Sequence, residues 1–319
     1  MWLRIFTRVA SAFATLAIVS LLIFSSTQLL PGDAAEALLG QQATPESLAA
    51  LRAQMGLDQP AALRYLHWIE GLSRGDLGTS IGSGVPVASL IREPFLNSLK
   101  LAALAAFISI PLALSLGLLS VLRLGSIWDR GINLGALCAV SVPEFFVAVL
   151  LTYLFAVQLG WLPATATIRP SQSIEQQLRA LILPTAVLTL VVTAHMARMT
   201  RSAVLNVLTL PYIETALLKG VRRREIILRH ALPNVVAPIV SVIAVVIAYL
   251  VAGVVVVEVA FAYPGLGRLM VDSVAIRDLP LIQACGLIFC AVYLLVNLLA
   301  DIVTTVTNPR LRSAGRGQS

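Results

Sequence analysis

Six apolar stretches, separated by polar segments, dominate the pattern of residues along the chain. Each has about 20 or more residues with few charges, which is the length that an α-helix needs to cross the hydrocarbon core of a bilayer. They lie at about Val9–Leu30, Ser98–Leu122, Ile132–Leu159, Leu178–Ala197, Val235–Val257 and Leu281–Thr304. The pattern therefore predicts an all-α, polytopic membrane protein with six transmembrane helices.

The composition agrees with this class. Hydrophobic residues make up 58% of the chain, charged residues only 12%, and the mean hydropathy is +0.89. A soluble domain has about 25% charged residues, so a soluble protein is excluded. The three cysteines, Cys138, Cys285 and Cys290, fall inside predicted spans, and the three histidines lie in different regions. The sequence therefore predicts no metal site.

Lys and Arg are distributed unevenly between the two sides of the predicted membrane. If the N-terminus is cytoplasmic, that side carries 14 of the 23 Lys and Arg residues. An excess of Lys and Arg in cytoplasmic loops is the positive-inside pattern, so both termini are assigned to the cytoplasm. The net charge of +7 is then explained by topology. No basic run interleaved with aromatic residues is present, so nucleic acid is not an expected partner.

The N-terminal region raises the question of a signal peptide. Its apolar run is about 20 residues long, longer than the 7–15 of a signal peptide, and no A-x-A-like site precedes Pro31-Gly32-Asp33. We therefore expect a retained first span. Residues 1–96 are assigned to this span plus an extra-cytoplasmic cap, 97–312 to a transmembrane domain, and 313–319 to a disordered tail.

Two helices are expected in the cap. Pro45–Met55 has helical apolar spacing, with Thr44 as N-cap and Pro45 in the first turn. Ala61–Leu72 is amphipathic, and Tyr65 and Trp68 suit a membrane-interface position. A packing role for this cap is favoured over a catalytic one.

The segment Tyr212–Pro233 is a basic, amphipathic insert in a connection of about 35 residues, and so long a connection is uncommon unless it has a function. Tyr212–Lys219 and Val221–Arg229 each fit a helical period, and Gly220 lies at their junction, where it permits a sharp bend. Such a helix pair either lies at the lipid headgroups or inserts into a groove of a partner protein.

The residue order in this insert resembles the EAA loop of ABC importer permeases. The residues that carry this resemblance are Glu214, Thr215, Ala216, Gly220, Leu232 and Pro233. Other motifs follow in the same order as in the oligopeptide, dipeptide and nickel importer permease family, specifically the first of its two homologous subunits. They are Pro31-Gly32-Asp33, Gly56-Leu57-Asp58, Gly75-Asp76-Leu77-Gly78, Glu258 to Gly267, Asp278-Leu-Pro280, Asn297 to Asp301, and Asn308-Pro309-Arg310. The match covers about Arg4 to Arg312. His230, Pro233 and Asn308 depart from the residues usual in that family.

The resemblance implies an ABC type I importer permease fold and a transporter subunit rather than an enzyme. The chain has no G-x-x-x-x-G-K-[ST] motif, so ATP is expected on a partner ATPase and no cofactor on this chain. The implied coupling loop spans about 198–234. Its contact residues are Glu214, Thr215, Ala216, Lys219, Gly220, Leu232 and Pro233. The alternative is that Ala216 and Gly220 pack against helices of their own chain.

The implied partners are a second homologous permease subunit, two ABC ATPase subunits or domains, and an external solute-binding protein. The implied location is the bacterial cytoplasmic (inner) membrane, and the implied substrates are dipeptides or oligopeptides. Nickel or glutathione import by the same mechanism is the alternative. An ion-coupled secondary transporter is disfavoured because no internal repeat is visible, and an intramembrane enzyme because no catalytic cluster is present.

Three acidic residues in or near the spans are functional hypotheses, since charge in a membrane is costly. Glu258 is expected at the outer interface, solvated or paired within Phe261–Gly267, and Asp301 paired with a cytoplasmic Arg; both are interpreted as structural. Glu144, after Pro143, is expected about 21 Å into the third span, close to the midplane. It either faces the translocation path or is a protonated group hydrogen-bonded to a neighbouring helix.

Overall fold

The computed structural model describes residues 2–29, 44–54, 58–168 and 172–307. Within these ranges the chain is helical, with no strand and one isolated bridge between Thr79 and Pro86. The helices that the fold is built from are α1 (Trp2–Gln28), α3 (Pro45–Gln54), α4 (Ala61–Ser73), α5 (Val87–Leu122), α6 (Ile127–Ser141), α7 (Glu144–Thr152), η2 (Tyr153–Gln158), α8 (Ile174–Leu208), α9 (Pro211–Leu218), α10 (Arg223–Glu225), η3 (Ile226–Ala231), α11 (Leu232–Ala260), α12 (Leu266–Ala275) and α13 (Leu279–Thr307). The expected motifs at 31–33, 56–57 and 308–310 and the tail 313–319 lie outside the described residues.

Five of the six predicted spans correspond to single long apolar helices, namely α1, α5, α8, α11 and α13. All five are longer than the apolar runs suggested, and the largest extensions are in α5 and α8. α5 begins at Val87 rather than Ser98, so the proposed boundary at 96/97 falls inside this helix. α8 ends at Leu208 rather than Ala197, and so includes residues 198–208 with the charged Arg198 and Arg201.

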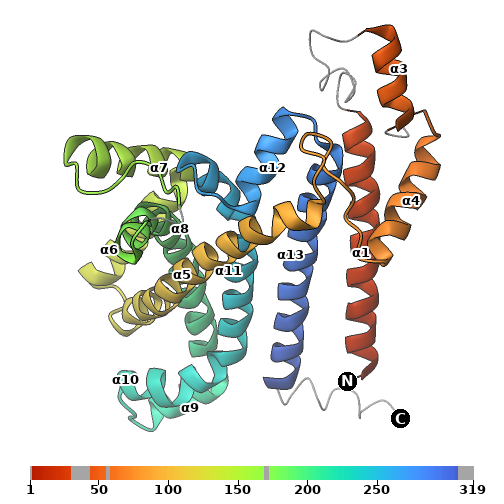
Figure 1. Ribbon diagram of the computed structural model, residues 1–319. Helices are drawn as coiled ribbons and strands as arrows, with labels where there is room; N and C mark the ends of the chain where they lie inside the picture. Colours follow the sequence, from red (N-terminus) through yellow and green to blue (C-terminus); the bar gives the residue numbers. More distant parts are fainter. Residues whose placement is uncertain (1, 30–43, 55–57, 169–171, 308–319) are drawn as a thin grey trace. The chain divides into compact units, whose positions relative to one another are not determined.

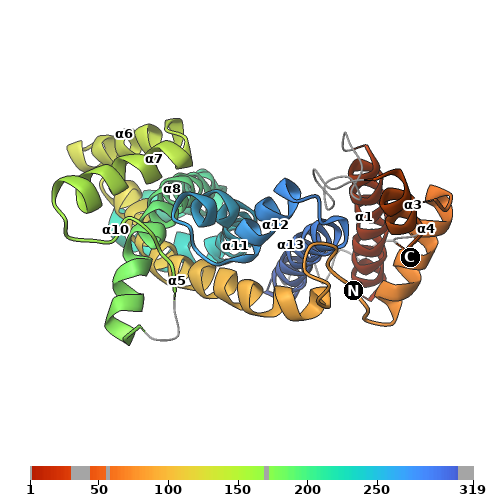
Figure 2. The same ribbon diagram turned by 45° about the horizontal axis from the view of Figure 1, so that its top comes forward.

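The predicted third span is not continuous. α6 ends at Ser141 and α7 begins at Glu144, so the span is drawn as two helices (Figure 2). The axis of α6 and that of Glu144–Gln158 are bent by 98° relative to each other. Proline lacks an N–H for the helical ladder, and its ring disfavours the helical conformation of the residue before it. Val142, with ψ of 127°, is accordingly extended. The prediction of one continuous helix over Ile132–Leu159 is therefore wrong, and the depth of Glu144 no longer follows from counting residues along that helix.

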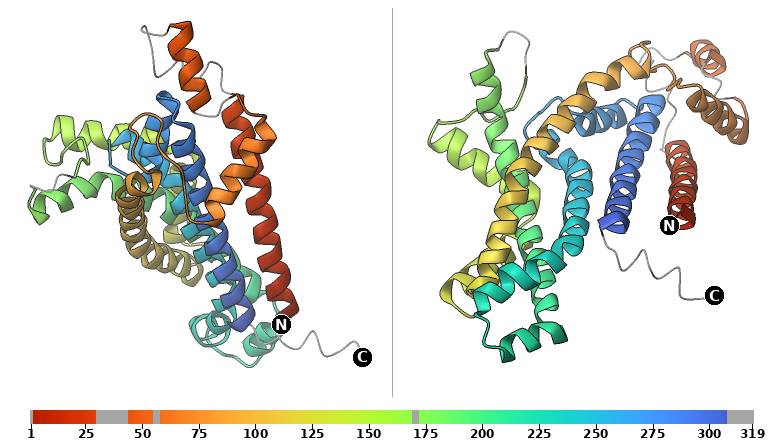
Figure 3. Two further views of the ribbon diagram at one scale, coloured as in Figure 1. Left: turned by 45° about the vertical axis from the view of Figure 1, so that its right-hand side comes forward. Right: turned by 90° about the horizontal axis from the view of Figure 1, so that it is seen from below.

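The chain divides into two compact units, and one consists of residues 10–98 and 264–292. In this unit α4 packs along α1 (Figure 3, left). The Tyr65 and Trp68 rings lie 5.4 and 6.0 Å from the ring of Phe24, and the hydroxyls of Tyr65 and Ser20 are 2.9 Å apart. The structure therefore places these two aromatic residues against α1. Both expected cap helices are present, and the Thr44 hydroxyl accepts the backbone N–H of Ser47 as the N-cap prediction requires.

Asp278 holds a surface hairpin in the same unit. Its buried carboxylate accepts hydrogen bonds from the Ser80 hydroxyl and from the backbone N–H groups of Ile81 and Gly82. A carboxylate that accepts several N–H and O–H groups is strongly satisfied, because each bond is charge-assisted. Asp278 thus ties the loop before α5 to the turn before α13.

The other unit consists of residues 1–9, 99–263 and 293–319, and its core lies where α5, α7, α8 and α11 meet (Figure 1). The buried residues are mainly Val, Leu and Ala, including Leu101, Leu188 and Leu250. Gly117 of α5 lies so close to α8 that an added Cβ would be 2.8 Å from the Cβ of Thr200. Small residues at such a crossing let two helix backbones approach closely.

Candidate functional site

The expected coupling loop is a short helix, a glycine turn and a second helical segment, at one end of α8 and α11 (Figures 1 and 3). α9 starts at Pro211, a position where the missing N–H costs nothing. It ends just before Gly220, which has a φ of +77° and donates its N–H to the carbonyl of Leu217. Glycine adopts this left-handed conformation without steric cost, so it ends the helix. The prediction that Gly220 forms the junction is confirmed.

One face of α9 is fixed to the spans. Ile213 is 1% exposed and lies in an apolar cluster, here named the loop core. The buried residues of the loop core are Val121, Val204, Val207, Ile213, Ile226, Ile227, Ala231 and Val235. They come from α5, α8, α9, η3 and α11. The loop core therefore joins α9 to the ends of three spans, α5, α8 and α11, by apolar packing.

The two leucines of α9 are exposed rather than packed in the loop core. Leu217 is 53% exposed and Leu218 is 85% exposed. The single apolar face expected for Tyr212–Lys219 is therefore divided, with Ile213 inward and the two leucines outward. Two exposed leucines on one short helix form a patch of the kind that partner proteins cover.

The predicted contact residues separate into two groups. Glu214, Thr215, Lys219, Gly220 and Pro233 are exposed. Ala216 and Leu232 are partly buried, and Ala216 packs against the loop core. For Ala216 this favours the alternative of packing within the chain. Gly220 has no atom near its missing side chain in the described structure, so packing within the chain does not explain it.

Glu144 is the first residue of α7, directly after the break at Pro143. Its Oε1 accepts a hydrogen bond from the hydroxyl of Tyr249 on α11. The Tyr249 ring lies 6.2 Å from the ring of His195 on α8. The sequence singled out Glu144 but neither partner, because an isolated Tyr or His in an apolar helix carries no spacing signal.

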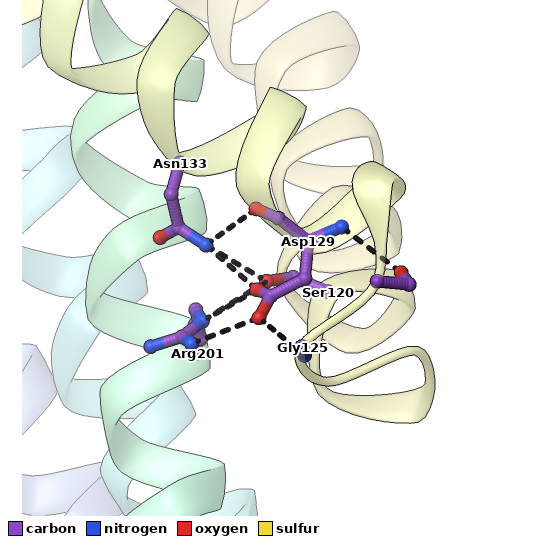
Figure 4. A network of polar contacts seen from close by, with 6 residues as sticks. Ser120, Gly125, Asp129, Asn133 and Arg201 are labelled. Carbon is purple, nitrogen blue, oxygen red and sulfur yellow. Dashed lines mark hydrogen bonds and ion pairs between the residues drawn. The ribbon is translucent and has the colours of Figure 1, made fainter.

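A second polar cluster was not predicted at all (Figure 4). Asp129 on α6 is buried and forms an ion pair with Arg201 on α8, with 3.0 Å between Oδ1 and Nε. Its carboxylate also accepts the Ser120 hydroxyl, the Gly125 backbone N–H and the Asn133 amide. In the sequence, Arg201 is one of the 14 Lys and Arg residues assigned to the cytoplasmic side, and nothing near it indicates a partner. The one signal that the sequence offers for this pair is that Asp129 precedes the third predicted span and Arg201 follows the fourth, so both lie on the same side of the membrane.

The other two acidic residues behave structurally. Asp301 forms an ion pair with Arg8 at 2.8 Å, as predicted. Glu258 is fully buried, so solvation is excluded. Tyr263, in the following loop, interacts with it electrostatically, and burial together with that carboxylate raises the pKa of Tyr263. The loop also receives a hydrogen bond from Ala166 N–H to the Phe261 carbonyl.

An apolar groove of about 1130 Å³ runs between α5, α6 and α8. Its lining includes Trp128, Gly131, Gly135 and Thr189, but neither Glu144 nor any residue of α9. The groove is therefore separate from both candidate sites.

In the described part of the chain, long apolar helices, one bent helix pair and a loop helix packed on the ends of α5, α8 and α11 are typical of a membrane-integral protein. The chain belongs to the family described as binding-protein-dependent transport system inner membrane component, which matches residues 109–313. The N-terminal component of the same systems matches residues 1–104. Members are permease subunits of ABC importers, so the chain is a transporter subunit and not an enzyme. ABC importers of this kind work with an ATPase and a substrate-binding protein.

Relatives with assigned names cover nearly the whole chain. A probable peptide ABC transporter permease of Sinorhizobium fredii is 36% identical over 98% of this chain and 100% of its own length. The glutathione transport system permease protein of Salmonella typhimurium is 37% identical over 96% of this chain and 97% of its own. The permease fold is also that of an inward-facing methionine ABC transporter, with a TM-score of 0.53 and 17% identity over 69% of this chain and 97% of that one.

Proposed function

We propose that the chain is one of two homologous permease subunits of an ATP-driven peptide importer in the bacterial cytoplasmic (inner) membrane. Two ABC ATPase subunits or domains and an external solute-binding protein complete the assembly. ATP is bound by the ATPase, and this chain binds no cofactor. The names of the relatives support peptides as substrates, and glutathione, itself a peptide, is the second candidate.

The observation that carries this proposal is the division of α9. Ile213 anchors the helix in the loop core, and Leu217 and Leu218 face outward. A helix held on one side and apolar on the other fits the groove of a partner protein. Glu214, Thr215, Lys219 and Gly220 are exposed around the two leucines and form the rim of the proposed contact, with Pro233 as its outlying member at the start of α11.

The path for the substrate is proposed to run past the break in the third span. Pro143 creates this break, and Glu144 begins the helix after it. Broken helices at the level of the membrane place polar backbone groups where a cavity needs them. Closure of the ATPase would move α9, and through the loop core the ends of α5, α8 and α11.

The proposal is tested by measuring the ATP-dependent uptake of a radiolabelled tripeptide into right-side-out membrane vesicles, with inverted vesicles as the control. Leu218→Glu places a charge in the contact and should abolish uptake while the chain remains inserted. Leu63→Glu, at a half-exposed leucine of α4, is the matched control and should leave uptake unchanged. Normal uptake by the Leu218→Glu transporter would refute the coupling role of α9. Identifying the ligand of the co-purifying solute-binding protein decides between peptides and glutathione.

A further inference from the structure

Three polar side chains from three different helices meet beside the break in the third span. Glu144 accepts the hydroxyl of Tyr249, and the rings of Tyr249 and His195 are 6.2 Å apart with an interplanar angle of 47°. Gly253, one turn along α11, leaves room beside them. An ideal Cβ there would lie 3.7 Å from Glu144 Oε1 and 3.4 Å from the Tyr249 ring. None of the three side chains is fully buried.

The position of the cluster along the spans is given by Tyr249. It is the central residue of the candidate span Pro238–Ala260, which is highly apolar. A helix that spans the bilayer places its central residue near the midplane. The partly exposed faces of the cluster therefore lie at a depth where lipid would not tolerate them, and they require a polar cavity or a ligand.

Glu144 is surrounded by groups that interact favourably with a carboxylate oxygen. It occupies the first position of α7, where the helix dipole and the unpaired N–H groups stabilise negative charge. Tyr249 donates to it, and a donated O–H also stabilises a carboxylate. A single carboxylate with a phenol ring beside it is the pair of groups that recognises an organic ammonium, through an ion pair and a cation–π contact.

We propose that Glu144, Tyr249 and His195 form a binding site for the protonated amino group of the transported molecule. The proposal rests on the proposed import function and names the chemical group that the path recognises. Glu144 pairs with the ammonium, the Tyr249 ring lies against it, and His195 closes the aromatic side. A bare divalent cation fits poorly, because no group of three metal-ligating side chains occurs in the described part of the chain.

Charge-selective labelling of a thiol at Gly253 tests the site without knowledge of the substrate. Cys138, Cys285 and Cys290 are first replaced by Ala, and Gly253→Cys is introduced in the full transporter with its ATPase. The probes are aminoethyl methanethiosulfonate, an ammonium, and sulfonatoethyl methanethiosulfonate, an anion. The measured quantity is the ratio of their reaction rates, with and without Glu144→Gln.

We expect the thiol to react with the ammonium reagent in preference, and Glu144→Gln to lower the rate ratio by about tenfold, since a charge a few Å away in a partly screened site has an effect of this order. Glu175→Gln, which removes an exposed carboxylate at the start of α8, should leave the ratio unchanged. If Gly253→Cys does not insert, Val256→Cys, three residues further on α11 and partly exposed, serves in its place.

A thiol that reacts with neither reagent, with or without ATP, would overturn the proposal, as would a rate ratio that Glu144→Gln does not change. The labelling needs no coupled transport. A charge preference in a transporter that shows no ATP-dependent uptake would therefore support the binding site and refute the importer function. ATP-dependent uptake without a charge preference would support the importer function and refute the binding site.

Discussion

Arg201 on α8 and Asp129 on α6 are joined by two hydrogen bonds, with Nε 3.0 Å from Oδ1 and Nη2 3.3 Å from Oδ2. The pair fixes the start of the broken third span to the part of α8 that leads into α9 (Figure 4). α6 supplies no buried residue to the loop core. The ion pair is therefore a direct polar link between the end of α8 that leads into α9 and the helix that precedes Glu144.

Breaking this pair should destabilise the protein strongly. Arg201→Gln leaves a buried carboxylate without its counter-charge, and we expect a loss of about 3–5 kcal/mol in the free energy of unfolding. Adding Asp129→Asn should recover part of it, because the two effects share one interaction. Denaturant unfolding of the purified transporter in detergent measures both.

Arg8→Gln is the control for this prediction. Its partner Asp301 and Arg8 itself are 41% and 63% exposed, and an exposed pair contributes about 1 kcal/mol or less. Equal losses for Arg201→Gln and Arg8→Gln would contradict the importance given to burial.

The contact between α5 and α8 predicts a difference between two helical glycines. Gly117→Ala would bring a Cβ to within 2.9 Å of the Ala197 carbonyl oxygen, a backbone atom that cannot move alone. Overpacking of this kind costs about 1–3 kcal/mol. Gly131→Ala on α6 meets nothing within 4 Å and should be neutral or slightly stabilising, since Ala is the better helix former. Thermal unfolding compares the two, and equal midpoints would show that the α5–α8 approach is less close.

Gly220 and Gly84 allow backbone strain to be separated from docking. Both have positive φ, +77° and +69°, and neither has an atom within 4 Å of an added Cβ. Leu at either site pays a similar strain of about 1–2 kcal/mol. Gly220→Leu should in addition weaken ATPase association by roughly tenfold or more, through about 1–3 kcal/mol of overpacking. Quantitative co-purification of the ATPase measures this, and equal retention by the two variants would refute a close contact at Gly220.

The orientation in the membrane follows from charge alone and remains a prediction. Val85→Cys, on the hairpin before α5, should react with an impermeant maleimide in intact cells. Arg223→Cys, at the start of α10, should react only after permeabilisation. The opposite labelling pattern would place α9 on the outside of the membrane and would refute its proposed contact with an ATPase.

The sequence predicted those features that have a periodic or a positional signal. The apolar runs predicted the spans. Gly220 predicted the turn after α9, because glycine at the junction of two helical segments usually marks a bend. Pro143 was noticed, but a proline inside an apolar run was compatible with a kink as well as with the 98° break that is present. The continuous helix expected over Ile132–Leu159 is absent for this reason.

Features that depend on tertiary contacts could not be predicted in the same way. Asp129 and Arg201 are 72 residues apart, and nothing local to either specifies the other. Ile213, Leu217 and Leu218 all belong to one helix, and only the packing of α9 into the loop core decides which of them is buried. The proximity of Tyr249 and His195 to Glu144 arises only from the way α7, α8 and α11 meet in the fold.

Site-specific photo-crosslinking at Leu218 tests the central claim most directly. A benzophenone amino acid replaces Leu218, the more exposed of the two leucines of α9, and in a second variant it replaces Leu63 on α4. After illumination of cells, we predict a crosslink from position 218 to a protein that contains an ATP-binding cassette, identified by mass spectrometry, and none from position 63. Position 218 crosslinking only to lipid, or to this chain itself, would contradict the assignment of α9 as the coupling helix.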